Sequence, residues 1–272
     1  MNNNLKVVII TGANSLIGKE IALRFLNSNW KVHGTLRSKI EHIDLIENEN
    51  MFYHELDLLD TISIYNVFSE ILNIEGRIDT LINNAGFVLS GAFETYTEEQ
   101  IKRQMDVNFW GSVYCIKQVI PLMKKIKSGI IINISSLCGL VTFPMFSMYH
   151  ASKWAIEGFS ESIRYELDMF GIKIKLVEPG GVMDNNYKST VEFGTINSEE
   201  YNEMLYKVHN TNWFPSFSNS NDVAQIVYNA VIDNTNRFRY IIGKESEMFI
   251  NERTLGFDDE SYILKIKKRI EN

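Results

Sequence analysis

The 272-residue sequence has little cysteine and no excess of positive charge, and each shortage excludes a class of protein. Its two cysteines, Cys115 and Cys138, are too few for a disulfide framework and favour a reducing compartment. The formal net charge of -7 argues against nucleic acid as a partner, because proteins that bind a phosphate backbone usually carry a basic face. The five histidines do not pair at metal-ligand spacing with one another or with the cysteines, so we expect no metal site.

Targeting and membrane-spanning segments are also lacking. The first residues, Met1 to Leu5, lead directly into an apolar run, without the basic region, apolar stretch and small-residue cleavage site of a secretory signal. The uncharged stretch Ser128–Ser152 is long enough to suggest a membrane span, but polar residues and Pro144 interrupt it. We therefore expect a cytoplasmic protein with no membrane span.

Short apolar runs rich in Val, Ile and Leu recur along the chain and predict strands that are buried on both faces. The runs are Lys6–Ile10, Lys31–Leu36, Met51–Leu56, Thr80–Ile82, Gly129–Ile134, Ile172–Val177 and Tyr240–Ile242. Amphipathic helical patterns lie between them, at Leu16–Asn27, Ile62–Ile74, Glu98–Met123, Tyr149–Phe170 and Asp222–Ile232. This alternation predicts an α/β fold: a single doubly wound Rossmann-type domain over residues 1–272, with a mainly parallel seven-stranded sheet and helices on both faces.

One segment, residues 183–220, departs from the alternation and is rich in Asn, Ser and Tyr. Long insertions of this kind are either functional lids or plain surface loops. We predict a helical lid over a substrate pocket, with a surface insertion as the alternative.

Unusual residues gather where the predicted strands end. They are Thr11–Gly18, Arg37, Asp57, Asn83–Gly86, Ser135–Ser136 and Glu178–Gly181. Open parallel sheets bind ligands beyond the carboxyl ends of their strands. Because the ends of six predicted strands converge on one edge, we predict a binding site there.

The loop after the first predicted strand has the glycines of a dinucleotide-binding turn. Gly12 suits a tight turn, and Gly18 lets the following helix pack closely on the sheet, so that its free N–H groups face a pyrophosphate. Taken alone, an ordinary strand-to-helix turn explains these glycines equally well. Leu16 stands where such a loop usually has a middle glycine. Its side chain either points into the core and leaves the backbone path open, or weakens cofactor binding.

Several motifs together resemble the short-chain dehydrogenase/reductase family over nearly the full length of the chain. They are the Thr11–Gly18 loop, Asn83-Asn84-Ala85-Gly86, Asn108, Ser136, Tyr149-xxx-Lys153 and Pro179-Gly180. The order and spacing of these motifs are more specific than any one of them. Within the family, the chain is most similar to the branch of hydroxysteroid dehydrogenases, retinol dehydrogenases and ketoreductases. The resemblance implies an oxidoreductase that transfers a hydride between a nicotinamide cofactor and a carbonyl or secondary alcohol.

The resemblance implies four catalytic residues. Tyr149 would be the general acid and base; its ordinary pKa of ~10 is too high for this role, but Lys153, four residues on along a helix, favours the phenolate. Ser136 would donate a hydrogen bond to the substrate oxygen, and Asn108 would hold a water that relays protons from Lys153. Ser135 competes with Ser136 but would face the opposite side of its strand.

Each of these residues also has a plainer interpretation. Tyr149 and Lys153 could be a surface aromatic ring and a solvated charge, and Asn108 could be a polar group in helix packing. Cys138 and His150 lie near the site in sequence, and we expect both to be packing residues.

The resemblance further implies a set of cofactor-binding residues. They are Gly12, Asn14, Ser15, Leu16, Ile17, Gly18, Arg37, Asp57, Leu58, Asn84, Ala85, Gly86, Tyr149, Lys153, Pro179, Gly180 and Val182. Neither Thr35 nor Leu36 offers the carboxylate that accepts hydrogen bonds from the ribose of NAD, whereas Arg37 suits a 2′-phosphate. NADP(H) is therefore favoured over NAD(H), with Arg37 as a solvated loop charge the alternative. Asp184 stands where the family often has a threonine.

The expected substrate is a mainly apolar, fairly large small-molecule carbonyl or alcohol, because aromatic and apolar residues dominate the expected wall of the pocket. The candidates are Phe143, Pro144, Met145, Phe146, Tyr187, Trp213 and Phe214. The resemblance implies a homodimer or homotetramer that pairs through the helices Glu98–Met123 and Tyr149–Phe170. Two other functions stay open: an NAD-preferring alcohol dehydrogenase, and a non-catalytic nucleotide-binding sensor or scaffold, which Leu16 and Asp184 allow.

Overall fold

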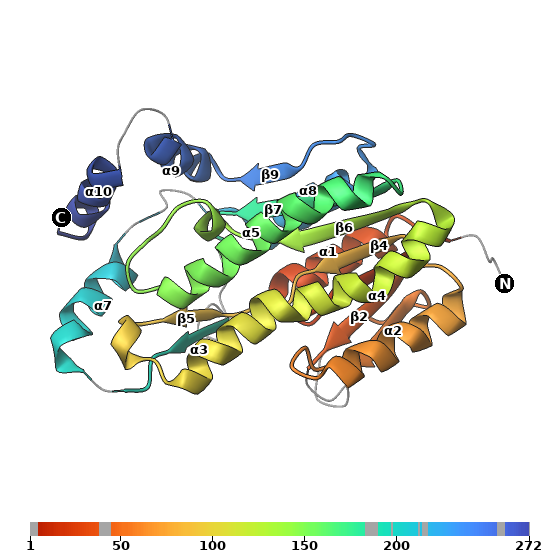
Figure 1. Ribbon diagram of the computed structural model, residues 1–272, viewed down its shortest axis with the longest axis horizontal. Coiled ribbons are helices and arrows are strands. Elements are labelled where there is room, and N and C mark those ends of the chain that lie inside the picture. Colours follow the sequence, from red (N-terminus) through yellow and green to blue (C-terminus); the bar gives the residue numbers. More distant parts are fainter. Residues whose placement is uncertain are drawn as a thin grey trace.

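The centre of the molecule is a seven-stranded sheet in which every neighbouring pair of strands is parallel, in the order β3-β2-β1-β4-β6-β7-β9 (Figure 1). A computed structural model describes residues 5–37, 45–182, 190–196, 198–211, 213, 217–254 and 259–271. The strands are β1 (Val7–Thr11), β2 (Lys31–Leu36), β3 (Met51–Glu55), β4 (Thr80–Asn83), β6 (Gly129–Ile134), β7 (Ile172–Pro179) and β9 (Arg239–Ile242). The predicted fold class and all seven predicted strands are confirmed.

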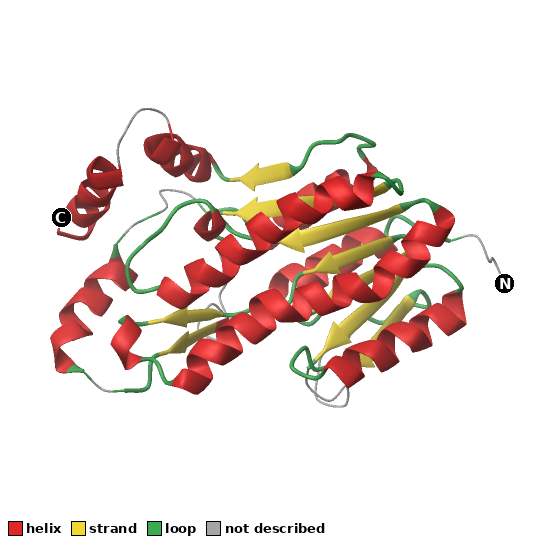
Figure 2. Ribbon diagram, in the orientation of Figure 1, coloured by secondary structure: helices red, strands yellow, loops and turns green. Residues whose placement is uncertain are grey.

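Helices cover both faces of the sheet, as predicted (Figure 2). The helices α1 (Leu16–Leu26) and α8 (Ser220–Ile232) pack on one face, and α2 (Thr61–Glu75), α4 (Gly111–Ile126) and α5 (Ser147–Asp168) pack on the other. Successive side chains of a strand point to opposite faces, so Ile10 joins the core under α1 and Ile9 the core under α2 and α4.

Local sequence signals start and stop the helices. The Asp60 side chain accepts a hydrogen bond from Ile62 N at the start of α2, and Gly76 ends this helix in the left-handed conformation, with φ of 68°. A capping box of Thr97 and Gln100 starts α3 (Glu98–Met105), where each side chain bonds the backbone of the other residue. These caps fix where each helix begins relative to the strand ends.

The helix predicted over Glu98–Met123 is wrong as a single element. It consists of α3, a π-helical segment η3 (Asp106–Trp110) and α4. The Asn108 side chain in η3 bonds the backbone of Phe87, and the wider turn is how the chain accommodates this contact. Residues 106–110 contain neither glycine nor proline, so no helix-breaking signal separates the segments and the pattern predicts one helix.

Several elements beyond the seven strands gather past the carboxyl ends of the sheet, where β5 (Val88–Ser90), β8 (Val191–Phe193) and α7 (Asn202–Asn210) lie (Figure 1). β5 and β8 form a separate parallel pair. The C-terminal helices α9 (Lys244–Thr254) and α10 (Asp259–Glu271) follow β9. The predicted lid is helical at α7 but contains the unpredicted strand β8; its residues 183–189, 197, 212 and 214–216 lie outside the described residues.

Candidate active site

The turn after β1 is packed so closely that two of its positions admit only glycine. Gly12 has a φ of +66°, and a Cβ added there would lie 3.0 Å from the Cα of Ala85. At Gly18, an added Cβ would lie 2.3 Å from the carbonyl oxygen of Gly12. The N-terminus of α1 is thus brought against the β1 turn, and its first N–H groups point toward the edge where the strands end.

Asn84, which follows β4, holds this turn in place. Its Nδ2 donates hydrogen bonds to Thr11 O (3.0 Å), Gly12 O (3.1 Å) and the Ser15 Oγ (3.1 Å). Thr11 Oγ1 in turn accepts from the backbone N–H groups of Asn84 and Ala85. The cofactor-binding residues that the resemblance implies do not include Thr11, although the predicted binding loop begins with it. Because Nδ2 and the backbone N–H of Asn84 support the loop, a cofactor would have to contact other atoms of this residue.

Leu16 does not point into the core, which corrects one of the two readings that the sequence allows. It is the first residue of α1 and is 37% exposed, whereas Ile17 packs against the core. The inward face of α1 is taken by Ile17 and Ile21, four residues apart, which leaves Leu16 at the rim beside the exposed Asn14.

The predicted adenosine side of the site lies at the ends of β2 and β3. Arg37 is exposed directly after β2, while Thr35 and Leu36 are buried. Asp57 Oδ1 accepts a hydrogen bond from Leu59 N at 2.9 Å and closes a turn. Leu58 packs tightly on α4, because a Cβ at Gly111 would lie 2.9 Å from its Cβ.

Tyr149 and Lys153 lie one turn apart at the start of α5. The Lys153 Nζ is 5.7 Å from the centre of the Tyr149 ring and donates a hydrogen bond to Ile134 O, at the end of β6, at 2.9 Å. Lys153 is only 8% exposed, so it is not a solvated surface charge. Burial lowers the pKa of Lys153 to about 8, against the opposing influence of Cys138 and Glu157.

Ser136 follows β6 and faces the end of β7. Its Oγ accepts a hydrogen bond from Cys138 N at 3.1 Å and lies 3.4 Å from Pro179 O, to which it donates. Pro179 leads into Gly180, whose N–H donates to Ile242 O at 3.1 Å, and Val182 pairs with Ser218. The neighbouring Ser135 is buried on the side of Glu157, away from this group.

Asn108 uses its side chain for structure. Its Oδ1 accepts from Phe87 N at 3.0 Å, and its Nδ2 donates to Phe87 O at 2.9 Å and to Ser152 Oγ at 3.3 Å. Ser152 Oγ donates to Tyr149 O at 2.7 Å, which links the π-helical segment to α5. The side chain of Asn108 therefore has the packing role that the sequence leaves open as an alternative. Because its side-chain atoms are engaged, a water that relays protons would have to bind the backbone carbonyl of Asn108. A Cβ at Gly86 would meet Asn108 Oδ1 at 3.2 Å.

His150 and Cys138 are packing residues, as expected. The His150 Nε2 accepts from Phe143 N at 2.8 Å, and Nδ1 lies 2.8 Å from Cys138 O, which fixes the neutral ring in one tautomer. Burial lowers the pKa of His150 and raises the pKa of Cys138 to about 11. Together they hold the segment 138–143 over the site.

Apolar side chains form a wall beside this segment. Phe143 contacts Trp213 and Phe249, with ring centres 5.0 Å and 5.1 Å apart. Met145 packs on Ala92 and Val208, with Phe146 beside it, and Pro144 is half-buried. A hollow of about 170 Å³ adjoins this cluster through Ala92 and Leu205. Two other predicted wall residues, Tyr187 and Phe214, lie outside the described residues, as does Asp184.

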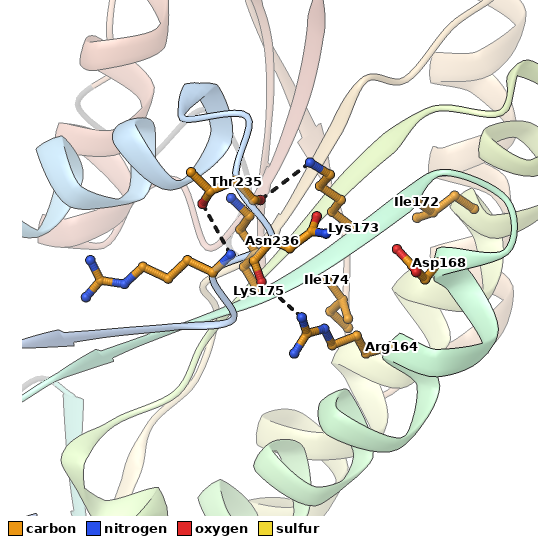
Figure 3. A pocket seen from close by; sticks show the side chains of 9 residues that line it. Arg164, Asp168, Ile172, Lys173, Ile174, Lys175, Thr235 and Asn236 are labelled. Carbon is orange, nitrogen blue, oxygen red and sulfur yellow. Dashed lines mark hydrogen bonds between the residues drawn. The ribbon is translucent and has the colours of Figure 1, made fainter.

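A second hollow, of only about 20 Å³, lies at the start of β7, at the end of the sheet away from Tyr149 (Figure 3). Arg164 Nη2 donates to Asn236 O, and Lys173 Nζ donates to Thr235 O, across its mouth. A volume of this size holds roughly one water molecule, so we assign it no ligand.

Two kinds of structure are absent from the described residues. They contain no group of three or more His, Cys, Asp or Glu side chains placed to hold a metal ion. No helix in this part of the chain combines the length and apolar character that crossing a bilayer requires.

Comparison with known proteins identifies the class. Residues 6–193 match the model of the short chain dehydrogenase family, and the chain belongs to this family of oxidoreductases. It is 38% identical over 206 residues to the 3-ketodihydrosphingosine reductase of Bacteroides thetaiotaomicron, covering 74% of each chain. It is also 33% identical over 244 residues to human retinol dehydrogenase 8, covering 83% of this chain and 78% of that protein.

Solved structures agree with this assignment. A short-chain dehydrogenase from Streptomyces avermitilis superposes with a TM-score of 0.85 at 28% identity, over 98% of this chain and 97% of the other. ElxO with NADP bound superposes with a TM-score of 0.76 at 28% identity, over 90% of this chain and 99% of the other.

Proposed function

We propose that this chain is an NADP(H)-dependent reductase or dehydrogenase that acts on the carbonyl or secondary alcohol group of a mainly apolar molecule. The observation that carries the proposal is the buried Lys153 one helical turn from Tyr149, with Ser136 at the end of the neighbouring strand. Burying an ammonium group costs free energy of folding. Groups whose pKa values are shifted by burial concentrate at functional sites, so the buried Lys153 beside Tyr149 favours a catalytic role.

The glycine turn after β1 fits a dinucleotide. The close contacts at Gly12 and Gly18 bring the N-terminus of α1 against the β1 turn, and such a helix N-terminus offers backbone N–H groups to a pyrophosphate. Ser15, Leu16 and Ile17 begin α1 and would hold the pyrophosphate, while Asp57, Leu58, Ala85 and Gly86 would line the adenosine side. Pro179, Gly180 and Val182 would flank the nicotinamide. When bound, the coenzyme supplies the hydride in reduction and takes it up in oxidation.

The proton chemistry belongs to the residues of this chain. In carbonyl reduction, Tyr149 donates its phenolic proton to the substrate oxygen, and Ser136 Oγ–H donates a hydrogen bond to the same oxygen as negative charge develops. The Lys153 ammonium stabilises the phenolate that remains. In alcohol oxidation, the phenolate takes up the proton. A water on the Asn108 carbonyl would return protons from solvent to Lys153.

Arg37 supports a preference for NADP(H) over NAD(H). It is exposed at the end of β2, free of the core, at the point where a guanidinium group can contact a 2′-phosphate. The solved structure of ElxO with NADP bound, and that of a metagenomic short-chain oxidoreductase in complex with NADP, support the same choice.

A large apolar substrate is supported by the wall of Phe143, Met145, Phe146 and Trp213. Two relatives are named for long or bulky apolar molecules, a ketodihydrosphingosine and a retinol. Two exposed aromatic rings support self-association through α5 and the region 98–123 as a homodimer or homotetramer. They are Trp110 (43% exposed), at the end of η3, and Trp154 (42% exposed), on α5.

Absorbance of NADPH during incubation with apolar ketones tests the proposal. We expect NADPH to be consumed, with a KM well below that for NADH. Arg37→Ala should raise the KM for NADPH about tenfold or more and leave the KM for NADH nearly unchanged, because only NADPH carries the 2′-phosphate. Equal effects on the two coenzymes would contradict the assigned role of Arg37. No consumption of either coenzyme with any ketone or alcohol would favour a binding protein without turnover.

A further inference from the structure

Two glutamates meet in the interior directly behind the catalytic residues. Glu157, on α5, is 4% exposed, and Glu178, on β7, is fully buried. A single guanidinium group faces both: the Nε of Arg239 lies 3.2 Å from Glu157 Oε2 and 3.3 Å from Glu178 Oε1. The Nη2 of Arg239 is directed at the half-exposed Glu161, at 2.7 Å. The Nε–H group of Arg239 donates a hydrogen bond to Glu157, whereas Glu178 has only the ion-pair contact with this guanidinium.

Three of the four carboxyl oxygens of this pair lack a donor. Within the described residues, Glu157 Oε1 and both oxygens of Glu178 have no hydrogen-bond partner, and the buried Ser135 Oγ beside Glu157 has none either. A buried acceptor without a donor costs free energy, and two buried like charges in contact do not both persist. A proton on one carboxyl group would supply the missing donor and remove the repulsion at the same time.

Burial and the charges around the pair also favour a protonated carboxyl group. Burial raises the pKa of Glu178, and the neighbouring Glu157 raises it further against the influence of Arg239. Burial also raises the pKa of Glu157, against the influence of Ser135 and Arg239. The other charged groups around the pair are Glu161 and Lys153 on α5 and Arg237 before β9.

We propose that Glu157 and Glu178 share one proton and hold a single negative charge behind Tyr149 and Lys153, and that this charge sets the pH range in which the site works. The second part rests on the function proposed above. Glu157 is one turn beyond Lys153 on the same helix face, and its charge favours the ammonium form of Lys153. Glu178 directly precedes Pro179, whose carbonyl accepts from Ser136. Both glutamates are positioning residues that act through these neighbours.

The sequence carries a signal for this pair that the motifs do not include. Glu178 directly follows the apolar residues Leu176 and Val177 in a strand that is predicted to be buried, and buried glutamates need a partner. Glu157 repeats the four-residue spacing that relates Tyr149 to Lys153. Neither feature reveals the other partner, because α5 and β7 meet only in the fold.

Glutamine variants test the proposal, because the amide keeps the shape and supplies a donor without a charge. Infrared spectra of the protein without coenzyme, at neutral pH, should show the carbonyl stretch of a protonated carboxyl group. This band should disappear in Glu178→Gln and in Glu157→Gln, because each single variant leaves one carboxylate that Arg239 neutralises. Glu161→Gln, which changes only the half-exposed partner of Arg239, should keep the band.

The pH profile of kcat/KM for oxidation of an apolar secondary alcohol by NADP⁺ gives the second readout. Each single variant keeps one negative charge, so its profile should stay within about 0.3 pH unit of the original. The double variant Glu157→Gln/Glu178→Gln removes the charge, which lowers the pKa of both Tyr149 and Lys153, so both limbs should move to lower pH by about one unit. A merely structural role would change the melting temperature without this shift.

Two infrared results would overturn the proposal: absence of the protonated carboxyl band, or survival of this band in both single variants. A third result, in the pH profile of kcat/KM, would also overturn it: a shift in each single variant that is about half of the shift in the double variant. The last result would mean two ionised carboxylates. If no alcohol or ketone is turned over, the function proposed above fails, while the infrared spectra still decide whether the proton is shared. If the double variant does not fold, the single variants still decide the same point.

Discussion

The side chain of Asn108 forms a two-point hydrogen bond with the backbone of Phe87, in which Oδ1 accepts at 3.0 Å and Nδ2 donates at 2.9 Å. This contact joins the π-helical segment between α3 and α4 to the turn after β4, and Ser152 extends it to α5. Three elements that carry expected site residues are thus connected through one amide. The position of the site therefore depends on Asn108 whether or not its carbonyl holds a water.

Replacing Asn108 by leucine keeps the volume and leaves the N–H group of Phe87 without a partner, while Phe87 O keeps its hydrogen bond from Gln104 Nε2. We expect the free energy of unfolding to fall by about 1–3 kcal/mol, as measured by urea denaturation. Asn229→Leu, on the exposed surface of α8, is the control and should change stability by about 0.5 kcal/mol or less. An Asn108→Leu variant as stable as the original would show that the Phe87 contact is dispensable.

Two helical glycines make a matched pair. In Gly18→Ala, the new Cβ would lie 2.3 Å from Gly12 O and 2.9 Å from Ser15 Oγ, so the turn must shift and NADPH affinity should fall by at least about tenfold. Gly158→Ala meets no atom within 4 Å on the exposed side of α5 and should stabilise the protein by about 0.5–1 kcal/mol. Isothermal titration with NADPH and thermal unfolding measure the two effects. Unchanged NADPH affinity in Gly18→Ala would argue against a cofactor at this turn.

The histidines make stability depend on pH. His33 Nδ1 lies 2.9 Å from His54 Nε2, and burial, with the nearby His54, lowers the pKa of His33 to about 4. Burial also lowers the pKa values of His54, His150 and His209. A lowered pKa in the folded state means that the unfolded chain binds more protons below pH 6.5. The contribution of these histidines to the free energy of unfolding is therefore complete above about pH 6.5 and is lost as the pH falls toward 4.

For His33 alone, the loss is on the order of 3 kcal/mol between pH 6.5 and the region below pH 4. Urea unfolding at a series of pH values measures it. His33→Gln, which cannot take up the proton, should flatten this dependence, although it is less stable at neutral pH. An unchanged slope in His33→Gln would mean that His33 does not carry the acid sensitivity.

Much of the framework could be predicted from the sequence, for identifiable reasons. The central strands of the sheet are buried on both faces, so they form apolar runs such as Gly129–Ile134 that stand out without any knowledge of their neighbours. Polar residues at strand ends, such as Asn84 and Ser136, converge because parallel strands end at one edge.

Other features depend on contacts that the local sequence does not record. The β5–β8 pair joins Val88 to Val191, about a hundred residues apart, through strands too short to show an alternation. The π-helical turn at Asn108 accompanies the contact with Phe87, which lies outside this helical region and is not recorded in its local sequence. The rim position of Leu16 follows from which face of α1 meets the core, and the Glu157–Glu178 contact from the packing of α5 on β7.

The most direct test of the account is the Tyr149→Phe variant, which removes one oxygen atom and keeps the ring. If the Tyr149 phenol transfers the proton, ketone-dependent oxidation of NADPH should fall by about a thousandfold, while the Kd for NADPH stays within about threefold. Tyr165→Phe, on the same helix with the tyrosine 73% exposed, is the control and should keep full activity. Ketone reduction that persists near the original rate in Tyr149→Phe would contradict the mechanism.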